Sequence, residues 1–429
     1  MKSAEEQLFI IQDGVEEIIP VEEFKQKLAR SIATNTPLKV KYGVDPTAPD
    51  LHLGHAVPLR KLRQFQDLGH VVQLLIGDYT ARVGDPTERS TTRPQLPAET
   101  IEANARTYTE QAFKILNPEK TVIDYNGRWF STMPFERVLK ITAQFTVARI
   151  LERDDFAKRF AAQVPISLHE FLYPVMQGYD SVELGCDIEI GGTDQKFNML
   201  AGRDLQRWAD QEPQVVITMP ILEGTDGYVR MSKSKGNYIG LTEPPEEQFG
   251  KIMSIPDFIM IRYFRLCTNE PHEEIDRIEK GLEDGTLHPN EIKRRLAKDV
   301  ISIYYGPEAA KEAERIFDAK FKKVEGGTAA ERLAAIGAEI PEVEITPDML
   351  TDDKRMWIVK LMTVADFAKT NGEARRLIEG GGVKYLEHVD GEYKEVAIKD
   401  PGIEIVPRTG DIIQVGKRRI ARIKVYSPS

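Results

Sequence analysis

The stretch PLKVKYGVDPTAPDLHLGHAVPLRKLRQFQDLG, residues 37–69, contains the structural unit that decides the fold. Its first part, PLKVKYGV (37–44), is a short apolar run that is typical of a buried strand. Its last part, GHAVPLRKLRQFQDLG (54–69), has the apolar spacing of an amphipathic helix. A strand joined to a helix by a short loop is the repeating unit of parallel α/β sheets.

The same alternation continues to residue 220, after an acidic N-terminal segment that we expect to be helical. It predicts a doubly wound parallel sheet of the Rossmann-like α/β class. In such sheets, ligands bind outside the carboxyl ends of the strands. The expected strands are 37–44, 70–78, 121–126, 186–192 and 213–220, and the expected helices are 54–69, 98–116, much of 134–160, 167–184 and 194–209.

The distribution of these patterns predicts three domains and a linker. From residue 244 the strand signals vanish and helical patterns dominate, and a later stretch rich in Gly, Pro and acidic residues is typical of a linker. The end of the chain has one basic helix followed by short strands and turns. We therefore expect a Rossmann-like catalytic domain at 1–243, an α-helical domain at 244–324, a linker at 325–354 and a small basic α+β domain at 355–429.

Charge is distributed unevenly along the chain. The formal net charge of −10 argues against nucleic-acid binding over the whole surface. Residues 354–429, however, contain 15 Lys and Arg against 10 Asp and Glu, whereas the rest of the chain contains 43 against 58. A basic module on an acidic body can hold RNA locally, so we expect the tail to bind RNA.

Composition excludes several other classes of protein. No stretch reaches 18 apolar residues, so we expect no membrane partner. The N-terminus lacks a basic segment followed by an apolar run, and two cysteines fit a reducing compartment, so we expect a cytoplasmic protein. Of seven histidines only His52 and His55 are close together and no third ligand is near, so we expect no metal site.

The loop after the first strand, DPTAPDLHLGH (45–55), carries groups suited to binding phosphate. His52 and His55 are three residues apart at the entry to the helix, so both can face the crevice. Gly54 permits close approach of the backbone, Thr47 adds a hydroxyl donor, and the helix N-terminus adds partial positive charge. Such donors stabilise charge that develops on a leaving pyrophosphate. A capped helix with two incidental histidines is the alternative interpretation of this motif alone.

A second polar motif, RMSKSKGN (230–237), follows the last expected strand. It therefore lies at the same rim of the sheet as the two histidines. A mobile lysine in such a loop can close over phosphates during a reaction. Alone this motif could be a solvated loop, but the order of the two motifs on this architecture indicates function.

The two motifs resemble the His-Ile-Gly-His and Lys-Met-Ser-Lys-Ser signatures of class I aminoacyl-tRNA synthetases. Between them, Tyr173, Gln177 and Asp180 are spaced i, i+4 and i+7, so one helix face presents all three. On an arbitrary helix these residues would form a solvated stripe. The sequence YPVMQGYD (173–180), however, closely resembles the amino-acid-binding helix of tyrosyl-tRNA synthetases, and the similarity extends over nearly the whole chain.

This resemblance implies roles for individual residues. In the family, the matching Tyr and Gln hold the substrate's amino group and the matching Asp binds its phenol. Because phenylalanine would leave that buried Asp unpaired, such a pocket rejects it. The resemblance implies tyrosine binding by Lys41, Asp85, Tyr173, Gln177, Asp180 and Gln195; ATP binding by Asp45, His52, Gly54, His55, Gly192, Asp194, Met231 and Lys233; and catalysis, chiefly through the phosphates, by Thr47, His52, His55, Arg89, Arg93, Arg230 and Lys233.

The basic tail, EARRLIEGGGVKY…GDIIQVGKRRIARI, is similar to a small RNA-binding module shared with a ribosomal small-subunit protein. The resemblance also implies that the helical domain recognises the anticodon. The alternative for the tail is a merely solvated basic surface. The candidate phosphate-binding patch consists of Arg375 and Arg376 on the expected helix and Lys417, Arg418 and Arg419 on a turn.

Three positions depart from the family pattern. Arg230 replaces the first lysine of the second signature, which keeps the charge but changes the donor geometry. Lys41-Tyr42-Gly43 stands where many bacterial relatives have Tyr-Cys-Gly, so strand alternation points Tyr42 to the other face and Lys41 takes the place of a phenol-capping tyrosine. Glu189 stands where a glutamine is common. The family pattern therefore does not predict how this end of the pocket binds the phenol hydroxyl of the substrate.

The resemblance implies a tyrosine–tRNA ligase reaction with L-tyrosine, ATP and tRNA(Tyr) as substrates. It also implies that Mg²⁺ is delivered with ATP and that the enzyme is a homodimer with tRNA crossing between subunits. One alternative is a tryptophanyl-tRNA synthetase, against which the pocket helix and the basic tail argue. Another is a non-catalytic RNA-binding paralogue, against which the two nearly intact signatures argue.

Overall fold

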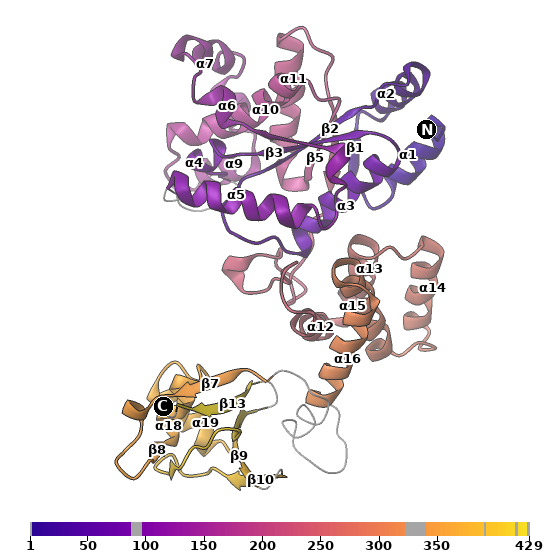
Figure 1. Ribbon diagram of the computed structural model, residues 1–429. Helices are drawn as coiled ribbons and strands as arrows, with labels where there is room; N and C mark the ends of the chain where they lie inside the picture. The colour runs from indigo at the N-terminus through magenta and orange to yellow at the C-terminus, as the bar shows by residue number, and fades with distance from the viewer. Residues whose placement is uncertain (1, 87–96, 322–339, 390–391, 417–418, 427–429) are drawn as a thin grey trace. The chain divides into compact units, whose positions relative to one another are not determined.

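The computed structural model describes residues 2–86, 97–321, 340–389, 392–416 and 419–426. It divides into two compact units, Met1–Pro307 and Glu308–Ser429, each of which contains its own sheet (Figure 1). The boundary between the units thus lies before residue 324, where we expected the helical domain to end.

The first unit is built on a six-stranded sheet in the order β1-β6-β5-β2-β3-β4. Neighbouring strands from β6 to β4 are parallel, which confirms the expected doubly wound class. The edge strand β1, which we did not expect, pairs antiparallel with β6. The strands are β1 (Glu17–Ile19), β2 (Lys39–Val44), β3 (Val71–Ile76), β4 (Thr121–Tyr125), β5 (Ile188–Gly192) and β6 (Val215–Met219).

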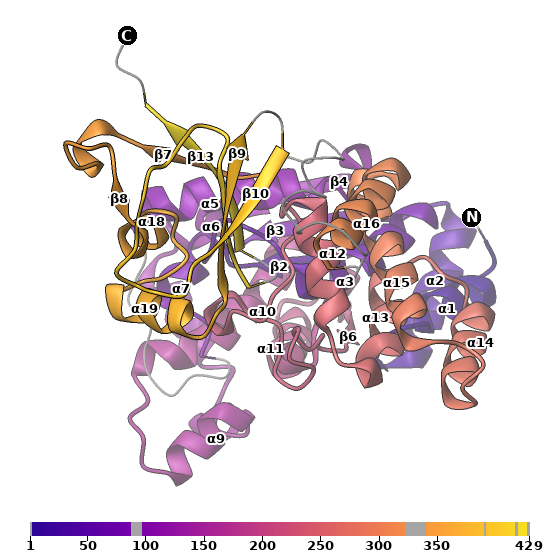
Figure 2. The ribbon, with the colours of Figure 1, turned by 90° about the horizontal axis from the view of Figure 1, so that it is seen from below.

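Helices cover both faces of this sheet (Figure 1). Helices α3 and α5 lie on one face, whereas α10 and α11 pack together on the other. Helix α9 projects from the rest of the unit (Figure 2). The helices of this part are α1 (Ala4–Gln12), α2 (Val21–Thr34), α3 (Leu53–Asp67), α4 (Thr80–Val83), α5 (Ala98–Ala112), α6 (Gly127–Phe130), α7 (Phe135–Thr142), α8 (Val147–Ile150), α9 (Asp154–Ala161), α10 (Leu172–Leu184) and α11 (Lys196–Trp208).

Local sequence explains the bounds of α10, the helix expected to bind the amino acid. Pro174 lies in its first turn, where its missing N–H is not needed for an intrahelical hydrogen bond. Gly185 ends the helix with a φ of 52°, a left-handed conformation that glycine adopts without strain. Tyr173, Gln177 and Asp180 are therefore held within one regular helix.

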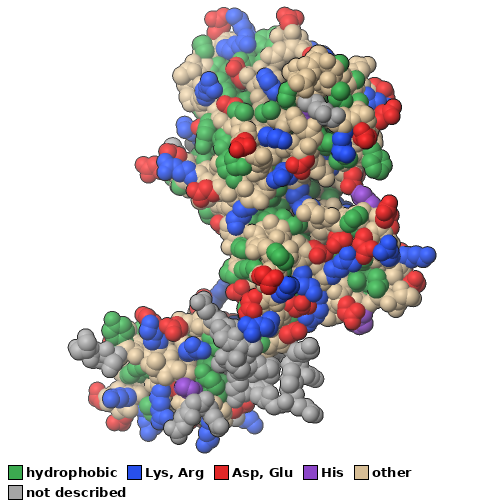
Figure 3. All heavy atoms as spheres, turned by 45° about the vertical axis from the view of Figure 1, so that its right-hand side comes forward, with side chains coloured by type: hydrophobic (Ala, Val, Ile, Leu, Met, Phe, Trp, Pro, Cys, Tyr) green, Lys and Arg blue, Asp and Glu red, His purple; other side chains and the backbone are tan. Residues whose placement is uncertain are grey.

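The first unit continues into a purely helical segment, as its sequence predicts. Acidic and basic side chains are interspersed over its surface (Figure 3), with ion pairs such as Arg265–Glu279 at 2.7 Å. None of the described helices is both long and apolar enough to cross a membrane. The segment contains α12 (Pro245–Ser254), α13 (Met260–Cys267), α14 (His272–Glu283) and α15 (Pro289–Tyr305).

The second unit begins with α16 (Pro307–Phe321) and contains a five-stranded sheet in the order β10-β9-β12-β13-β7. Its core forms between the sheet and two short helices. A small two-stranded sheet pairs β11 with β8. The elements are β7 (Glu342–Ile345), β8 (Met356–Trp357), α18 (Ile358–Val364), α19 (Asn371–Glu379), β9 (Val383–Val389), β10 (Glu392–Ala397), β11 (Glu404–Ile405), β12 (Ile412–Val415) and β13 (Arg419–Val425).

Two elements of this unit lie outside the expected small domain. Strand β7 falls within the stretch expected to be a linker, and it pairs parallel with β13. Near the end of α16, Ala319 shares an apolar cluster with Leu386 of β9 and Ile412 of β12. The second unit therefore includes a helix that precedes residue 322 and a strand that follows residue 339.

Candidate active site

A cavity of about 870 Å³ lies at the carboxyl ends of the strands in the first unit. Its lining includes every described residue that the sequence predicts to bind ATP or tyrosine or to act in catalysis. Arg89 and Arg93 lie outside the described residues. The residues brought together are Lys41, Asp45, Thr47, His52, Gly54, His55, Asp85, Tyr173, Gln177, Asp180, Gly192, Asp194, Gln195, Arg230, Met231 and Lys233.

The two histidines of the first motif lie at the start of α3 with their ring centroids 3.9 Å apart. A Cβ atom at Gly54 would approach the His52 ring to 3.0 Å, so glycine leaves room for this arrangement. Burial and the nearby cations lower the pKa of His52, and the same causes lower the pKa of His55 to about 4. Both rings are therefore neutral at pH 7. The His55 Nδ1 accepts the backbone N–H of His52 at 3.3 Å, so the ring proton lies on Nε2.

Backbone hydrogen bonds join the first signature motif to the segment that directly follows the second motif. Leu53 N–H donates to the Ile239 carbonyl, and Leu241 N–H donates to the Leu51 carbonyl, both at 2.9 Å. An antiparallel bridge between His52 and Gly240 lies between these bonds. The Lys233 ammonium also pairs with Asp50 at 2.7 Å. The second motif is thereby held against the first, as the order of the strands predicts.

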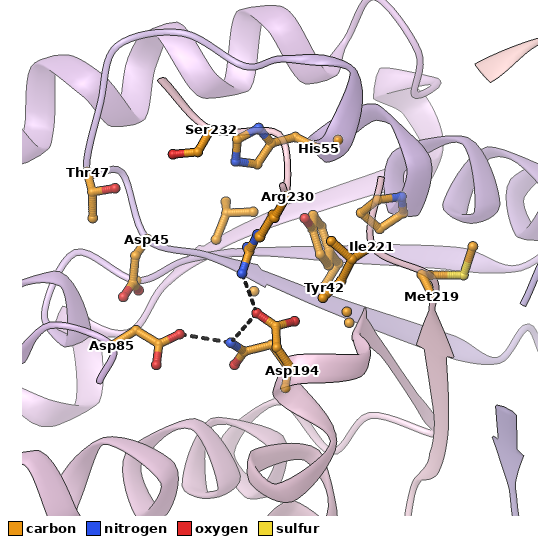
Figure 4. A pocket seen from close by; sticks show the side chains of 18 of the residues that line it. Tyr42, Asp45, Thr47, His55, Asp85, Asp194, Met219, Ile221, Arg230 and Ser232 are labelled. Carbon is orange, nitrogen blue, oxygen red and sulfur yellow. Dashed lines mark hydrogen bonds and ion pairs between the residues drawn. The ribbon is translucent and has the colours of Figure 1, made fainter. Parts of the chain in front are cut away.

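Arg230, which departs from the family pattern, points across the cavity towards Asp194 (Figure 4). Its guanidinium forms an ion pair with the Asp194 carboxylate at 2.7 Å. The Arg230 side chain remains 42% exposed, so it can reach a bound ligand. The cations of this motif thus pair with acidic groups at the rim of the cavity.

One end of the cavity presents acidic and amide groups suited to an ammonium. Gln195 Nε2 donates to Asp85 Oδ2 at 2.8 Å (Figure 4). From outside the cavity lining, Arg153 donates to Asp85 Oδ1 at 3.0 Å. The Tyr173 hydroxyl donates to Asp45 Oδ2 at 2.8 Å. These bonds fix the orientation of both carboxylates.

The cavity is also lined by Asp180, which is 2% exposed. Its carboxylate accepts a hydrogen bond from Trp129 Nε1 at 3.0 Å and another from Asn126 Nδ2 at 3.2 Å. Burial raises the pKa of Asp180 to about 7, although Lys41 and these two donors oppose the rise. A buried acceptor of this kind suits the hydroxyl of a phenol.

Strand β2 places Lys41 and Tyr42 on opposite faces of the sheet, as alternation predicts. Lys41 contacts α10 through the Gln177 carbonyl at 2.9 Å. Tyr42 lies with His55 and Tyr108 on the side covered by α3 and α5. Glu189, the third departure from the family pattern, is the ion-pair partner of Lys41 at 3.0 Å.

Sequence reasoning missed several polar residues of the site. Asn126 directly follows β4, so its position at the carboxyl end of an expected strand could have identified it. Trp129 and Arg153 come from α6 and the α8–α9 loop, and no motif marks them. Asn198 Nδ2 donates to Gln177 Oε1 at 2.8 Å and to Gln195 Oε1 at 2.9 Å, and it lies one helical turn after Gln195.

Within the described parts of the chain, no group of three or more His, Cys, Asp or Glu side chains is placed to hold a metal ion. In the second unit, Arg375 and Arg376 are exposed on α19, and the Arg375 guanidinium lies 5.3 Å from the Trp357 ring centroid. Arg419 donates to the carbonyl of Phe367 in the loop before α19. Lys417 and Arg418 lie outside the described residues.

Comparisons with known proteins show the family to which the chain belongs. Residues 33–322 match the family model of class I tRNA synthetases for tryptophan and tyrosine. The tyrosine–tRNA ligase of Moorella thermoacetica is 50% identical over 420 residues, which is 98% of this chain and 96% of that protein. The tyrosine–tRNA ligase of Thermotoga maritima is 47% identical over 98% of this chain and 97% of that protein.

Solved structures share the fold. The tyrosyl-tRNA synthetase of Archaeoglobus fulgidus, complexed with L-tyrosine, has a TM-score of 0.60 and 24% identity and covers 72% of this chain and 99% of its own. The C-terminally truncated mitochondrial enzyme of Aspergillus nidulans also has a TM-score of 0.60 and 24% identity, over 75% and 95% of the two chains. The tyrosine–tRNA ligases of Moorella thermoacetica and Thermotoga maritima match this chain over nearly its full length. The chain therefore belongs to the tyrosine–tRNA ligases, a branch of the class I tRNA synthetases.

Proposed function

We propose that the cavity joins L-tyrosine to AMP and then transfers the tyrosine to the 3′ end of tRNA(Tyr). The observation that carries this proposal is that the Tyr173, Gln177 and Asp180 face of α10 shares one cavity with the residues of both signature motifs. Tyrosine and the phosphates of ATP can therefore meet there. The membership of the chain in the tyrosine–tRNA ligases supports the same conclusion.

Tyrosine is proposed to lie along α10 with its two polar ends in different environments. Asp85, Tyr173, Gln177 and Gln195 surround the amino group. The phenol hydroxyl donates to the Asp180 carboxylate. Hydrogen bonds from Trp129 and Asn126 hold this carboxylate in place. Phenylalanine would leave this buried acceptor unpaired, which disfavours its binding.

ATP is proposed to bind along the first motif (45–55) and the second motif (230–237). Asp45, Gly54, His55, Gly192, Asp194 and Met231 would hold the nucleoside. The neutral His52 and the Thr47 hydroxyl would donate hydrogen bonds to the phosphates. Arg230 and Lys233 would exchange Asp194 and Asp50 for the triphosphate, and by resemblance Arg89 and Arg93 would contact the pyrophosphate.

In the first step, a carboxylate oxygen of tyrosine forms a bond to the α-phosphorus while the bond to pyrophosphate breaks. The protein positions the two substrates in line and stabilises charge on the leaving group. In the second step, a hydroxyl of the terminal tRNA ribose attacks the carbonyl carbon and AMP leaves. Neither step requires a covalent bond to the enzyme. Mg²⁺ is proposed to arrive bound to the ATP phosphates, and no step is assigned to a protein-held ion.

A second copy of this chain is the proposed partner of an exposed apolar surface. On α7, Phe135 is 73% and Leu139 is 53% exposed, one turn apart. Val147 of α8, Phe160 of α9 and Leu168 are also more than half exposed. Large exposed side chains on these consecutive elements are typical of an interface, and the family resemblance implies a homodimer. The second unit is proposed to bind tRNA through Arg375 and Arg376, and the enzyme is proposed to act in the cytoplasm.

The test is ATP–pyrophosphate exchange, run separately with tyrosine, tryptophan and phenylalanine, followed by charging of tRNA(Tyr). We expect exchange with tyrosine alone and stable attachment of tyrosine to the tRNA. Exchange driven by tryptophan would mean that the α10 pocket is misassigned. Saturable tRNA binding without exchange would instead support a non-catalytic RNA-binding protein.

A further inference from the structure

Two of the positions that depart from the family pattern, Lys41 and Glu189, are each other's partner. They lie directly opposite on the neighbouring parallel strands β2 and β5. The Lys41 ammonium is 3.0 Å from Glu189 Oε1, and the two side chains are 0% and 1% exposed. The two departures therefore form one structural unit rather than two independent changes.

All three N–H groups of Lys41 point at protein acceptors. Besides Glu189, its ammonium donates to the Gln177 carbonyl and to the Ser181 Oγ, each at 2.9 Å. An ammonium has three donors, so these contacts leave none for a ligand. Burial by itself lowers the pKa of Lys41, but the charges of Glu189 and Asp180 outweigh burial and raise it, so the group stays charged. Lys41 thus contributes a fixed positive charge at the pocket wall, with no N–H group left for a ligand.

The Glu189 carboxylate is equally occupied. Its Oε1 accepts from Gln177 Nε2 at 3.2 Å, and its Oε2 accepts from Ser181 Oγ at 3.1 Å and from Gln214 Nε2 at 2.5 Å. Both ends of the pair therefore hold Gln177, one through its backbone and one through its side chain. Asp180 lies on the same helix and is stabilised as a carboxylate by the charge of Lys41.

We propose that Lys41 and Glu189 form a buried ionic clamp that positions the tyrosine-reading side chains of α10, and that Lys41 does not touch the substrate. Lys41 is thus a positioning residue that acts through Gln177 and Asp180. This inference rests on the proposed function, because the side chains that the clamp positions are those proposed to bind tyrosine. It also changes the role expected for Lys41 from its sequence position, which was direct contact with the hydroxyl.

The clamp predicts strong coupling between the two positions. Lys41→Met leaves a buried carboxylate without its counter-charge next to Asp180, which is far more damaging than removing both charges. The double variant Lys41→Met/Glu189→Gln keeps a hydrogen-bonding amide at 189 and removes the unpaired charge. A side chain that contacts the substrate directly would behave differently, because its loss could not be restored by a change at 189.

The experiment compares Lys41→Met, Glu189→Gln and the double variant in full-length enzyme. ATP–pyrophosphate exchange gives KM for tyrosine and for ATP and the ratio of kcat/KM for tyrosine over phenylalanine. Lys27→Met is the matched control, because Lys27 is also a buried, ion-paired lysine, 1% exposed and 3.3 Å from Glu212, but does not line the cavity. Thermal unfolding of every variant separates loss of fold from loss of recognition.

We expect Lys41→Met to raise the KM for tyrosine about tenfold or more and to lower the tyrosine-to-phenylalanine ratio, with the KM for ATP within about twofold. We expect the double variant to regain a ratio within about threefold of wild type, while Lys27→Met changes only the melting temperature. A double variant with a ratio as low as that of Lys41→Met would overturn the clamp and show direct contact.

If Lys41→Met does not fold, the role of Lys41 is tested by comparing the tyrosine-to-phenylalanine ratio of kcat/KM in Glu189→Gln with that in the double variant. Loss of Lys41 in the Glu189→Gln background is expected to change the ratio by about threefold or less, and a larger fall would refute the clamp. Failure of the proposed function gives a distinct result, because wild-type enzyme would then show no tyrosine-dependent exchange. Wild-type activity together with coupling between positions 41 and 189 supports both conclusions.

Discussion

The pKa of Asp180 gives a quantitative prediction about tyrosine activation. The ionised carboxylate accepts the phenol hydrogen bond much more strongly than the protonated carboxyl would, and it also accepts from Trp129 and Asn126. Burial raises the pKa of this group to about 7, so the ionised form is favoured as the pH rises through neutrality. The ionised fraction is about 9% at pH 6 and about 91% at pH 8, so we expect kcat/KM for tyrosine to rise about tenfold over this interval.

Other charged groups around Asp180 do not produce the same profile. Lys41 from β2 stays charged because its pKa is raised. The pKa of His55 is about 4 and that of His52 is also lowered, so neither ring changes its charge between pH 6 and 8. The β5 carboxylate facing this site, Glu189, is paired with Lys41 at 3.0 Å. The titration of Asp180 therefore dominates within the pocket.

The assay is ATP–pyrophosphate exchange at saturating ATP and limiting tyrosine, from pH 5.5 to 8.5. Asp180→Asn is the control, because ATP titrates identically with both enzymes and its contribution cancels in their ratio. Losing a hydrogen bond to a charged acceptor removes about 1.5–3 kcal/mol, which lowers kcat/KM of the variant about 10- to 150-fold at pH 8. If kcat/KM for tyrosine depended on pH in the same way in the wild-type enzyme and in Asp180→Asn, Asp180 would not be the residue that binds the phenol hydroxyl.

Three further predictions address the other proposed roles. His52→Ala should slow single-turnover adenylate formation about 100-fold with little change in tyrosine affinity, and an unchanged rate would contradict its role at the phosphates. Phe160→Asp should convert the enzyme to monomers in analytical ultracentrifugation at concentrations where wild type is a dimer, whereas an unchanged mass would place the interface elsewhere. Arg375→Glu/Arg376→Glu should weaken tRNA binding and reduce its salt dependence without changing pyrophosphate exchange, and equal tRNA affinity would remove α19 from the RNA-binding surface.

The sheet of the first unit was predictable where strands carry their own signal. The run 37–44 is apolar enough to identify β2, and strand–helix alternation identifies its parallel neighbours. Strand β1 has only three residues, Glu17–Ile19, so it shows no period of its own and becomes a strand through pairing with β6. Strand β7 lies in a Pro- and acid-rich stretch and likewise depends on a distant partner, β13. These two strands therefore form because of pairing with distant strands and not because of their local sequence pattern.

In the candidate site too, some features were predictable from the sequence and others depend on tertiary contacts. Alternation along β2 was enough to place Lys41 and Tyr42 on different faces. The pairing of Lys41 with Glu189 was not predictable, because it depends on the register between β2 and β5. Arg153 was equally hidden, since it reaches Asp85 from a loop 68 residues away. Residue type and strand position predict which groups line a cavity, whereas their partners follow from three-dimensional packing.

The backbone hydrogen bonds between residues 51–53 and residues 239–241 also determine how late the His52 segment can become fixed while the chain is being synthesised. A chain emerging from the ribosome exposes the His52 segment first, but its bridge partner at Gly240 arrives 188 residues later. Until residue 241 is free, the segment lacks the acceptor and donor that fix it. Contacts of such long sequence separation form late because their loop-closure entropy must first be overcome. Nascent chains that end before residue 241 therefore lack the full set of backbone bonds that fixes the His52 segment, however well their first strands have paired.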